Sequence, residues 1–176
     1  MKKIKTVAYC RVSTRSTKQY KSFLTQKQFF ERYIKEHPEL ELVKTKECPT
    51  GIYADRGISG TLFHREEFED MLRAAGLNIQ AIDYKSSEKK DADGNPITIT
   101  YRDYITTFSN KNPEFSLILV KNTSRFARNI IDCIGYVRQL KAADPPIGVF
   151  FETENIFTLD ENSEMSHSFI ATLAQE

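Results

Sequence analysis

Short apolar runs alternate with longer amphipathic stretches along the chain. The apolar runs are typical of buried strands and occupy residues 4–12, 40–43, 117–120 and 147–151. Apolar residues repeat every three or four positions in three other stretches, which predicts helices over residues 20–36, 64–75 and from near 124 or 129 to 143. This alternation predicts an α/β fold with a mostly parallel central sheet flanked by helices.

Residues 79–101 interrupt this alternation. Residues 79–84 and 97–101 have the composition of strands, and the Asp93-Gly94 pair between them is a hairpin turn signal. We therefore expect an inserted β-hairpin, followed by a short helix over residues 104–110. The hairpin is either an edge decoration or a partner surface, and the sequence leaves both open.

Two further segments are predicted from turn residues and periodicity. Residues 52–61 contain two glycines and a serine, which predicts a mobile loop. An acidic stretch over residues 160–163 precedes apolar residues at helical spacing, which predicts a last helix from about residue 164. Because the sequence stops within this pattern, we expect a long C-terminal helix that is truncated here.

Composition narrows the class of protein. The 176 residues are 40% hydrophobic and 28% charged, which fits one soluble domain with a real core. No apolar run approaches the ~20 residues of a membrane span, and the N-terminus has no signal-peptide pattern. Three widely spaced cysteines predict reduced thiols in a cytoplasmic protein. The three histidines show no metal-ligand spacing and no nucleotide-binding glycine motif occurs, so we expect neither a metal nor a cofactor.

Charge restricts how this chain could bind nucleic acid. The formal net charge is only +1, whereas a free-standing DNA-binding module is usually much more basic. Any affinity for nucleic acid must therefore come from a local cationic patch or from a segment that this chain lacks.

The first strand carries the first candidate chemistry. Arg11 and Ser13 are two residues apart on one extended segment, so their side chains share a face. The carboxyl end of a strand is where open α/β sheets usually bind ligands. The pair is therefore a candidate anion site with a nucleophile beside it. The alternative is a serine that caps the next helix and an arginine that pairs with a carboxylate.

Three more arginines are candidates for the same anion. Arg65 falls in the first turn of a predicted helix, where a cation is disfavoured unless a ligand needs it; a solvated surface arginine is the alternative. Arg125 and Arg128 are three apart near the start of the helix that follows the most apolar strand. They could form an oxyanion cradle together with backbone N–H groups, or simply be surface charges.

Three ordered motifs resemble the N-terminal catalytic domain of the serine recombinases, closest to the large integrase and transposase type. Each motif is weak alone, but their order and spacing are specific, and the resemblance covers nearly the whole chain except the hairpin. The motifs are Tyr9-Cys10-Arg11-Val12-Ser13-Thr14, Tyr53-Ala54-Asp55-Arg56-Gly57-Ile58-Ser59-Gly60 with Arg65 shortly after it, and Ser124-Arg125-Phe126-Ala127-Arg128-Asn129.

The resemblance implies a role for each candidate residue. Ser13 matches the nucleophile that attacks a DNA phosphodiester, forms a 5′-phosphoserine link and releases a 3′-hydroxyl. Arg11, Arg65, Arg125 and Arg128 match the arginines that surround the scissile phosphate. The family uses no metal and no high-energy cofactor, which fits phosphoryl transfer because that chemistry depends on positioning and charge stabilisation.

The resemblance also implies a domain plan and partners. Residues 1–160 would form the catalytic domain, with the hairpin inserted at about 79–101, and residues 161–176 would begin a long oligomerisation helix. The DNA-binding region would be absent from this chain. The expected partners are double-stranded DNA at a specific recombination site and further copies of the protein, as dimers that pair into tetramers.

One residue departs from the family pattern. Many members have an aspartate before the first arginine of the third motif, and here that residue is Ser124. A serine orients an arginine only weakly, so a catalytically degenerate dimerisation module of the same fold is the second interpretation. A flavodoxin-type or phosphatase-like domain is the third, and it lacks the expected phosphate loop.

Overall fold

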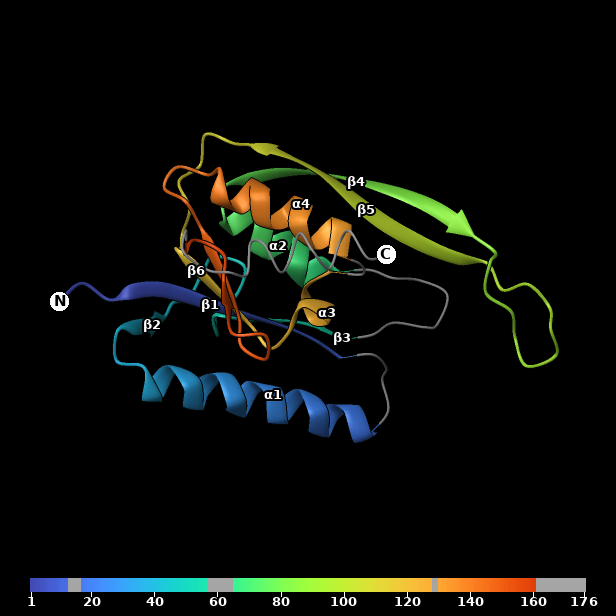
Figure 1. Cartoon of the computed structure of the whole chain (residues 1–176), viewed down its shortest axis with the longest axis horizontal. Helices are drawn as coiled ribbons and strands as arrows, with labels where there is room; N and C mark the ends of the chain where they lie inside the picture. Colours follow the sequence, from blue (N-terminus) through green and yellow to red (C-terminus); the bar gives the residue numbers. More distant parts are fainter. Residues whose placement is uncertain (13–16, 57–64, 128–129, 161–176) are drawn as a thin grey trace.

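The structure, a computed structural model, describes residues 1–12, 17–56, 65–127 and 130–160. Its main sheet is mostly parallel and forms the centre of the molecule (Figure 1). The strands of this sheet are β1 (Ile4–Val12), β2 (Leu40–Leu42), β3 (Ile52–Arg56), β6 (Leu117–Val120), β7 (Gly148–Phe151) and β8 (Ile156–Phe157).

The long strand β1 organises this sheet. One edge of β1 pairs with β2 along its first half and with β3 along its second half, both in parallel. Its other edge pairs in parallel with β6, and β7 and β8 follow outward. Among the described strands of this sheet, only β8 runs antiparallel. Because β1 is buried on both faces, its apolar run is nearly continuous.

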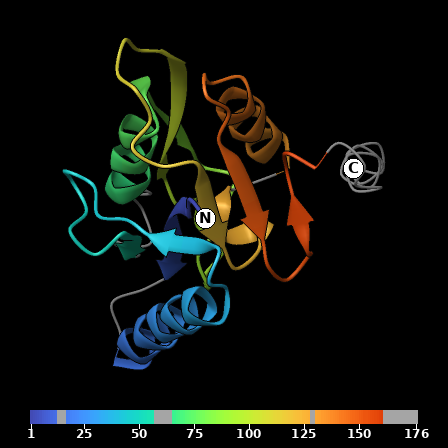
Figure 2. The same ribbon diagram turned by 90° about the vertical axis from the view of Figure 1, so that its left-hand side faces the viewer.

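Helices cover both faces of the sheet. They are α1 (Thr17–Glu36), α2 (Glu66–Ala74), α3 (Thr123–Phe126) and α4 (Ile130–Lys141). Figures 1 and 2 show α1 on one face and α2 with α4 on the other. The core divides in the same way: Tyr9, Phe68 and Ile118 belong to one buried cluster, whereas Cys10 and Phe30 belong to the other. Alternate residues of β1 thus contribute to opposite clusters.

The inserted hairpin forms a second sheet. Strands β4 (Leu77–Ser86) and β5 (Ile99–Phe108) pair antiparallel over ten residues each. The hairpin runs beside α2 and α4, and its tip projects beyond them (Figure 1). The hairpin is joined to α2 in the half of its strands nearer the tip, because Arg102 contacts Glu69 at 3.4 Å while also binding Asp83 at 2.7 Å.

The structure confirms the fold class, the central strands and the existence of the hairpin, and it overturns two local predictions. Residues 52–56 are strand β3 rather than loop, because they pair with the exposed edge of β1; residues 57–61 lie outside the described part. Residues 104–108 are not helical but continue β5, because β4 offers them partners as far as Leu77.

Several boundaries also differ from expectation. The hairpin strands span residues 77–86 and 99–108 rather than 79–84 and 97–101. Of the two starts expected for the helix after β6, the one near residue 129 fits α4 (Ile130–Lys141), and the separate short helix α3 lies near the other. The expected C-terminal helix lies outside the described residues. Within the part that the structure describes, no helix is both long and apolar enough to cross a membrane.

Candidate functional site

Arg11 and Arg125 are held together by reciprocal hydrogen bonds. Arg11, near the carboxyl end of β1, donates from Nη2 to the carbonyl oxygen of Ser124 at 3.2 Å. Arg125, on α3, donates from Nη1 to the carbonyl oxygen of Arg11 at 2.9 Å. Since β1 and β6 are neighbouring parallel strands, their carboxyl ends bring these arginines to one edge of the sheet.

The turn that carries Arg125 is fixed by two capping side chains. Asn122 Oδ1 accepts hydrogen bonds from the Arg125 amide at 3.1 Å and from the Ser124 hydroxyl at 2.7 Å. Glu154, in the turn between β7 and β8, accepts from the amide and hydroxyl of Thr123 through Oε1, at 3.0 and 2.9 Å. Asn122 is a common N-cap residue, so α3 begins directly after β6 although it is only one turn long.

Arg65 immediately precedes α2 as its N-cap residue rather than lying in the first turn. Its Nε and Nη2 donate to the Tyr9 hydroxyl at 3.1 and 3.0 Å, and Nη2 also donates to the Phe126 carbonyl. The guanidinium carbon lies 3.7 Å from the centroid of the Phe68 ring. These contacts orient Arg65 from three separate elements, and the stacking adds a cation–π attraction.

A buried carboxylate completes this network. The Tyr9 hydroxyl donates to Asp55 Oδ2 at 2.7 Å. Asp55 also accepts from the amides of Glu67 and Phe68 at 3.0 and 3.1 Å, and so caps the N-terminus of α2. Burial raises the pKa of Tyr9 far above its usual range, so the hydroxyl stays protonated. It therefore donates a hydrogen bond to Asp55. Its lone pairs are then available to Arg65.

Arg11 and Arg65 meet at one small pocket of about 30 Å³. The other residues that line it belong to β5 and α4: Tyr101, Arg102, Asp103, Asp132 and Tyr136. Burial, and then the positive charge of Arg65, lowers the pKa of Arg11, with Arg125 acting in the same direction. Like charges gathered this closely favour an anion between them, because an anion relieves their repulsion.

Two of the predicted site residues, Ser13 and Arg128, lie outside the described residues. The structure brings together the other three: Arg11 bonds to the Arg125 turn and shares a pocket with Arg65. Sequence reasoning missed Tyr9 and Asp55. The position of Tyr9, two residues before Arg11 on the same strand face, was a usable signal. Asp55 gives no such signal, because residues 52–61 have the local composition of a loop.

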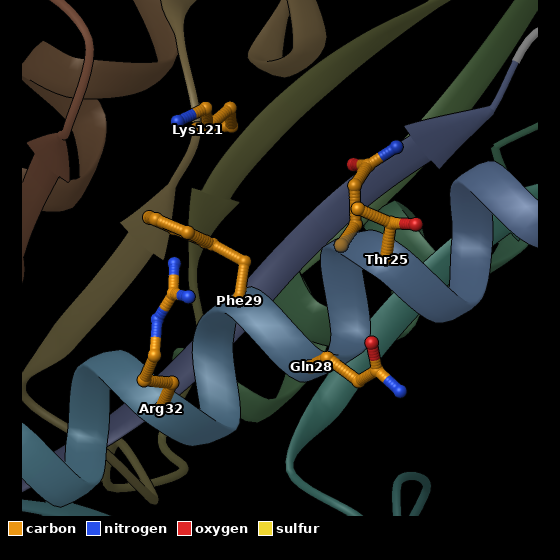
Figure 3. A pocket seen from close by; sticks show the side chains of 6 residues that line it. Thr25, Gln28, Phe29, Arg32 and Lys121 are labelled. Atoms are coloured by element: carbon orange, nitrogen blue, oxygen red, sulfur yellow. The ribbon is translucent and has the colours of Figure 1, made fainter.

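A larger cavity of about 490 Å³ lies between α1 and the end of β6 (Figure 3). Thr25, Gln26, Gln28, Phe29, Arg32 and Lys121 line it. The Lys121 ammonium lies 4.3 Å from the Phe29 ring centroid and 2.8 Å from Glu152 Oε2. None of the candidate residues lines this cavity. Among the described residues, no group of three or more histidine, cysteine, aspartate or glutamate side chains could hold a metal ion.

Comparisons with known proteins point to one family. Residues 6–83 match the family model described as "Resolvase, N terminal domain". That match includes Arg11, Asp55 and Arg65, whereas Arg125 lies beyond it. No curated protein matches the chain. Among solved structures, a resolvase family site-specific recombinase from Streptococcus pneumoniae is similar in fold, with a TM-score of 0.61 and 21% identity over 98% of this chain and 87% of that one.

Proposed function

We propose, from the premise that this chain belongs to the serine recombinase (resolvase) family, that it is the catalytic domain of a site-specific DNA recombinase. Ser13 is the nucleophile in this proposal, and Arg11, Arg65, Arg125 and Arg128 bind the scissile phosphate. The substrate is double-stranded DNA at a specific site, and the protein acts as dimers that pair into tetramers. Because the motifs most resemble those of the large integrase and transposase type, integration and transposition are the proposed reactions.

The chemistry is an exchange of one phosphodiester for another. The Ser13 hydroxyl oxygen attacks the phosphorus atom, the bond to the 3′-oxygen breaks, and the hydroxyl proton leaves while the 3′-oxygen gains one. The resulting 5′-phosphoserine link conserves the bond energy, so a free 3′-hydroxyl can reverse the step and rejoin DNA. Charge develops on the phosphoryl oxygens in this step, and fixed guanidinium groups stabilise it.

The observation that carries the proposal is the convergence of three arginines from distant segments. Arg11 lies in β1, Arg65 precedes α2 and Arg125 lies on α3, yet hydrogen bonds and a shared pocket join them. Arginine presents a planar set of N–H donors that matches phosphate oxygens. Because backbone carbonyls and Tyr9 already orient these groups, little reorganisation is needed when a phosphate arrives.

A covalent-adduct assay tests the nucleophile. We expect the full-length protein to form a protein–DNA adduct on a duplex that carries its recombination site. Ser13→Ala should bind the same duplex and form none, whereas Ser22→Ala on α1 should form it normally. An adduct with Ser13→Ala would show that another residue is the nucleophile.

The arginines can be tested in the same assay. Arg11→Ala, Arg65→Ala and Arg125→Ala should each raise the barrier to cleavage by roughly 3 kcal/mol, by analogy with the loss of one oxyanion donor. Adduct formation at the wild-type rate in any of these variants would remove that arginine from the phosphate site.

One observation favours the second candidate, a catalytically degenerate dimerisation module. The Ser124 hydroxyl donates to Asn122 Oδ1 and gives no carboxylate to orient an arginine. The two functions separate in the adduct assay, because a degenerate module would assemble on DNA without a covalent link.

We also propose that the protein works in the cytoplasm, where its buried free thiols, Cys10, Cys48 and Cys133, would stay reduced.

A further inference from the structure

The inserted hairpin borders the arginine pocket. Tyr101, Arg102 and Asp103 are consecutive residues of β5, and they line the same pocket as Arg11 and Arg65. Consecutive strand residues point to alternate faces, so a pocket that touches all three lies along an edge of β5. Within the described part of the chain, β5 pairs with β4 alone, and its other edge is therefore the one that faces the arginines.

The hairpin is fixed to the residues that orient the site. Arg102 bonds to both Asp83 of β4 and Glu69 of α2, which ties the hairpin to the helix that Arg65 precedes. The Tyr104 ring lies 6.1 Å from the Phe68 ring, and Phe68 is the ring on which Arg65 stacks. Because Arg102 and Tyr104 hold β5 against α2 in this way, β5 stays beside Arg65.

The hairpin also extends toward the part of the molecule where DNA would arrive. Figure 1 shows its tip projecting past α2 and α4, toward the end of the molecule at which β1 finishes. Arg11 lies at that end of β1. A DNA strand whose phosphate is held by Arg11 and Arg65 would therefore run past the free edge of β5.

The pocket is lined by cations and by acidic residues. Arg11 and Arg65 lie on one side, whereas Asp103 on β5 and Asp132 on α4 are acidic residues of the same lining. Arg102 also lines the pocket, but its charge is paired with Asp83 and Glu69. A phosphate bound to the arginines is attracted, but a phosphate displaced toward the hairpin is repelled by Asp103. Tyr101 offers an aromatic ring, which suits contact with a base or a deoxyribose.

We propose that the β4–β5 hairpin is a DNA-strand guide for the arginine pocket. In this assignment, which rests on the proposed function, Tyr101 contacts the nucleotide next to the phosphate that Arg11 and Arg65 hold. Asp103 is a specificity residue that rejects phosphates out of register with the arginines. The hairpin is then part of the DNA-binding surface and no mere decoration of the fold.

Photo-cross-linking tests the contact directly. The full-length protein is made with p-benzoylphenylalanine in place of Tyr101, or in place of Ile105 as the control on the same strand. Ile105 is 51% exposed and does not line the pocket. We expect the probe at Tyr101 to cross-link to the nucleotide beside the cleavage position in a site-bearing duplex, and the probe at Ile105 to give at least tenfold less product. Equal yields, or cross-links from Tyr101 only to protein, would overturn the assignment.

A charge substitution tests Asp103. Asp103→Asn removes a carboxylate at the pocket, whereas Glu41→Gln removes an exposed carboxylate on β2, beside the amino-terminal half of β1. We expect Asp103→Asn to bind a duplex without the recombination site about fivefold more tightly than wild type, because one repulsive charge is lost. Its preference for the site-bearing duplex should fall accordingly, while Glu41→Gln should behave like wild type. Identical binding by the two variants would overturn the role of Asp103.

Failure of this inference can be told apart from failure of the proposed function. The cross-linking and binding measurements need no covalent chemistry, and they can be repeated with Ser13→Ala. A Tyr101 cross-link without any serine adduct in the wild-type protein would keep the guide and remove the nucleophile. A normal adduct without the cross-link would keep Ser13 as the nucleophile and remove the role of the hairpin as a guide.

Discussion

Removing the hydroxyl of Tyr9 would test the network that positions Arg65. Tyr9 is fully buried, and its hydroxyl donates to Asp55 and accepts two hydrogen bonds from Arg65. Tyr9→Phe removes this one oxygen. The ring remains, and so does its edge-to-face contact with Phe68 at a centroid distance of 5.2 Å. The substitution therefore isolates the polar part of the contact.

The loss can be estimated from the bonds that disappear. The bond to the Asp55 carboxylate is charge-assisted, and losing it costs about 1.5–3 kcal/mol. Arg65 is half-buried, so water can partly replace the two hydrogen bonds that it loses. We assign the net loss of these two bonds roughly 1 kcal/mol. The free energy of unfolding should fall by about 2.5–4 kcal/mol in total. For a chain of this length, each kcal/mol lowers Tm by about 2–4 °C, so a decrease of roughly 5–15 °C is expected.

Urea denaturation followed by circular dichroism gives the measurement. Tyr20→Phe is the matched control, because Tyr20 is 56% exposed and its hydroxyl makes no hydrogen bond among the described residues. The slope of the unfolding free energy against urea should be unchanged in both variants, which would show that the same surface unfolds. If Tyr9→Phe and Tyr20→Phe had the same midpoint as wild type, the Tyr9 hydroxyl would not hold this network together.

Three further predictions concern other parts of the chain. Glu154→Gln keeps an acceptor for Thr123 but removes its charge, so the full-length protein should cleave DNA about tenfold more slowly, with the circular dichroism spectrum unchanged. Burial raises the pKa of Cys10 and of Cys133 to about 12, so both thiols should resist alkylation at pH 8 until urea unfolds the protein; rapid labelling of native protein would contradict their burial. Gly51 has φ +75° and an added Cβ would lie 2.5 Å from a backbone carbonyl oxygen, so Gly51→Ala should lower the unfolding free energy by about 2 kcal/mol or more; an unchanged melting temperature would contradict this.

Long-range pairing decided the parts of the fold that local pattern misjudged. Residues 52–56 are short and precede two glycines, so their local composition is typical of a loop, yet they pair with β1 from Ala8 to Val12. The periodicity of residues 104–108 does not distinguish a helix from a strand, and they form a strand because they pair with β4. In both places the hydrogen-bond partner lies elsewhere in the sequence, and a local window does not contain it.

The candidate site shows the same division. The cationic residues of the site could be identified in the sequence, because arginines near strand ends and helix starts are unusual. Arg11, Arg65 and Arg125 were singled out in this way. Their supports were less visible, since Tyr9 has the appearance of an ordinary core residue and Asp55 that of a loop acid. Only the packing of α2 against β1 and β3 shows that one carboxylate caps the helix and holds the tyrosine that orients Arg65.

The amino-acid sequence by itself determined the alternation of strands and helices, the inserted hairpin and the set of cationic residues, because periodicity and turn chemistry are local properties. The tertiary structure alone decided which arginines converge and that β5 of the hairpin borders them. These are relations between residues from 33 to 114 positions apart in the chain, and they arise from burying the faces of one shared sheet.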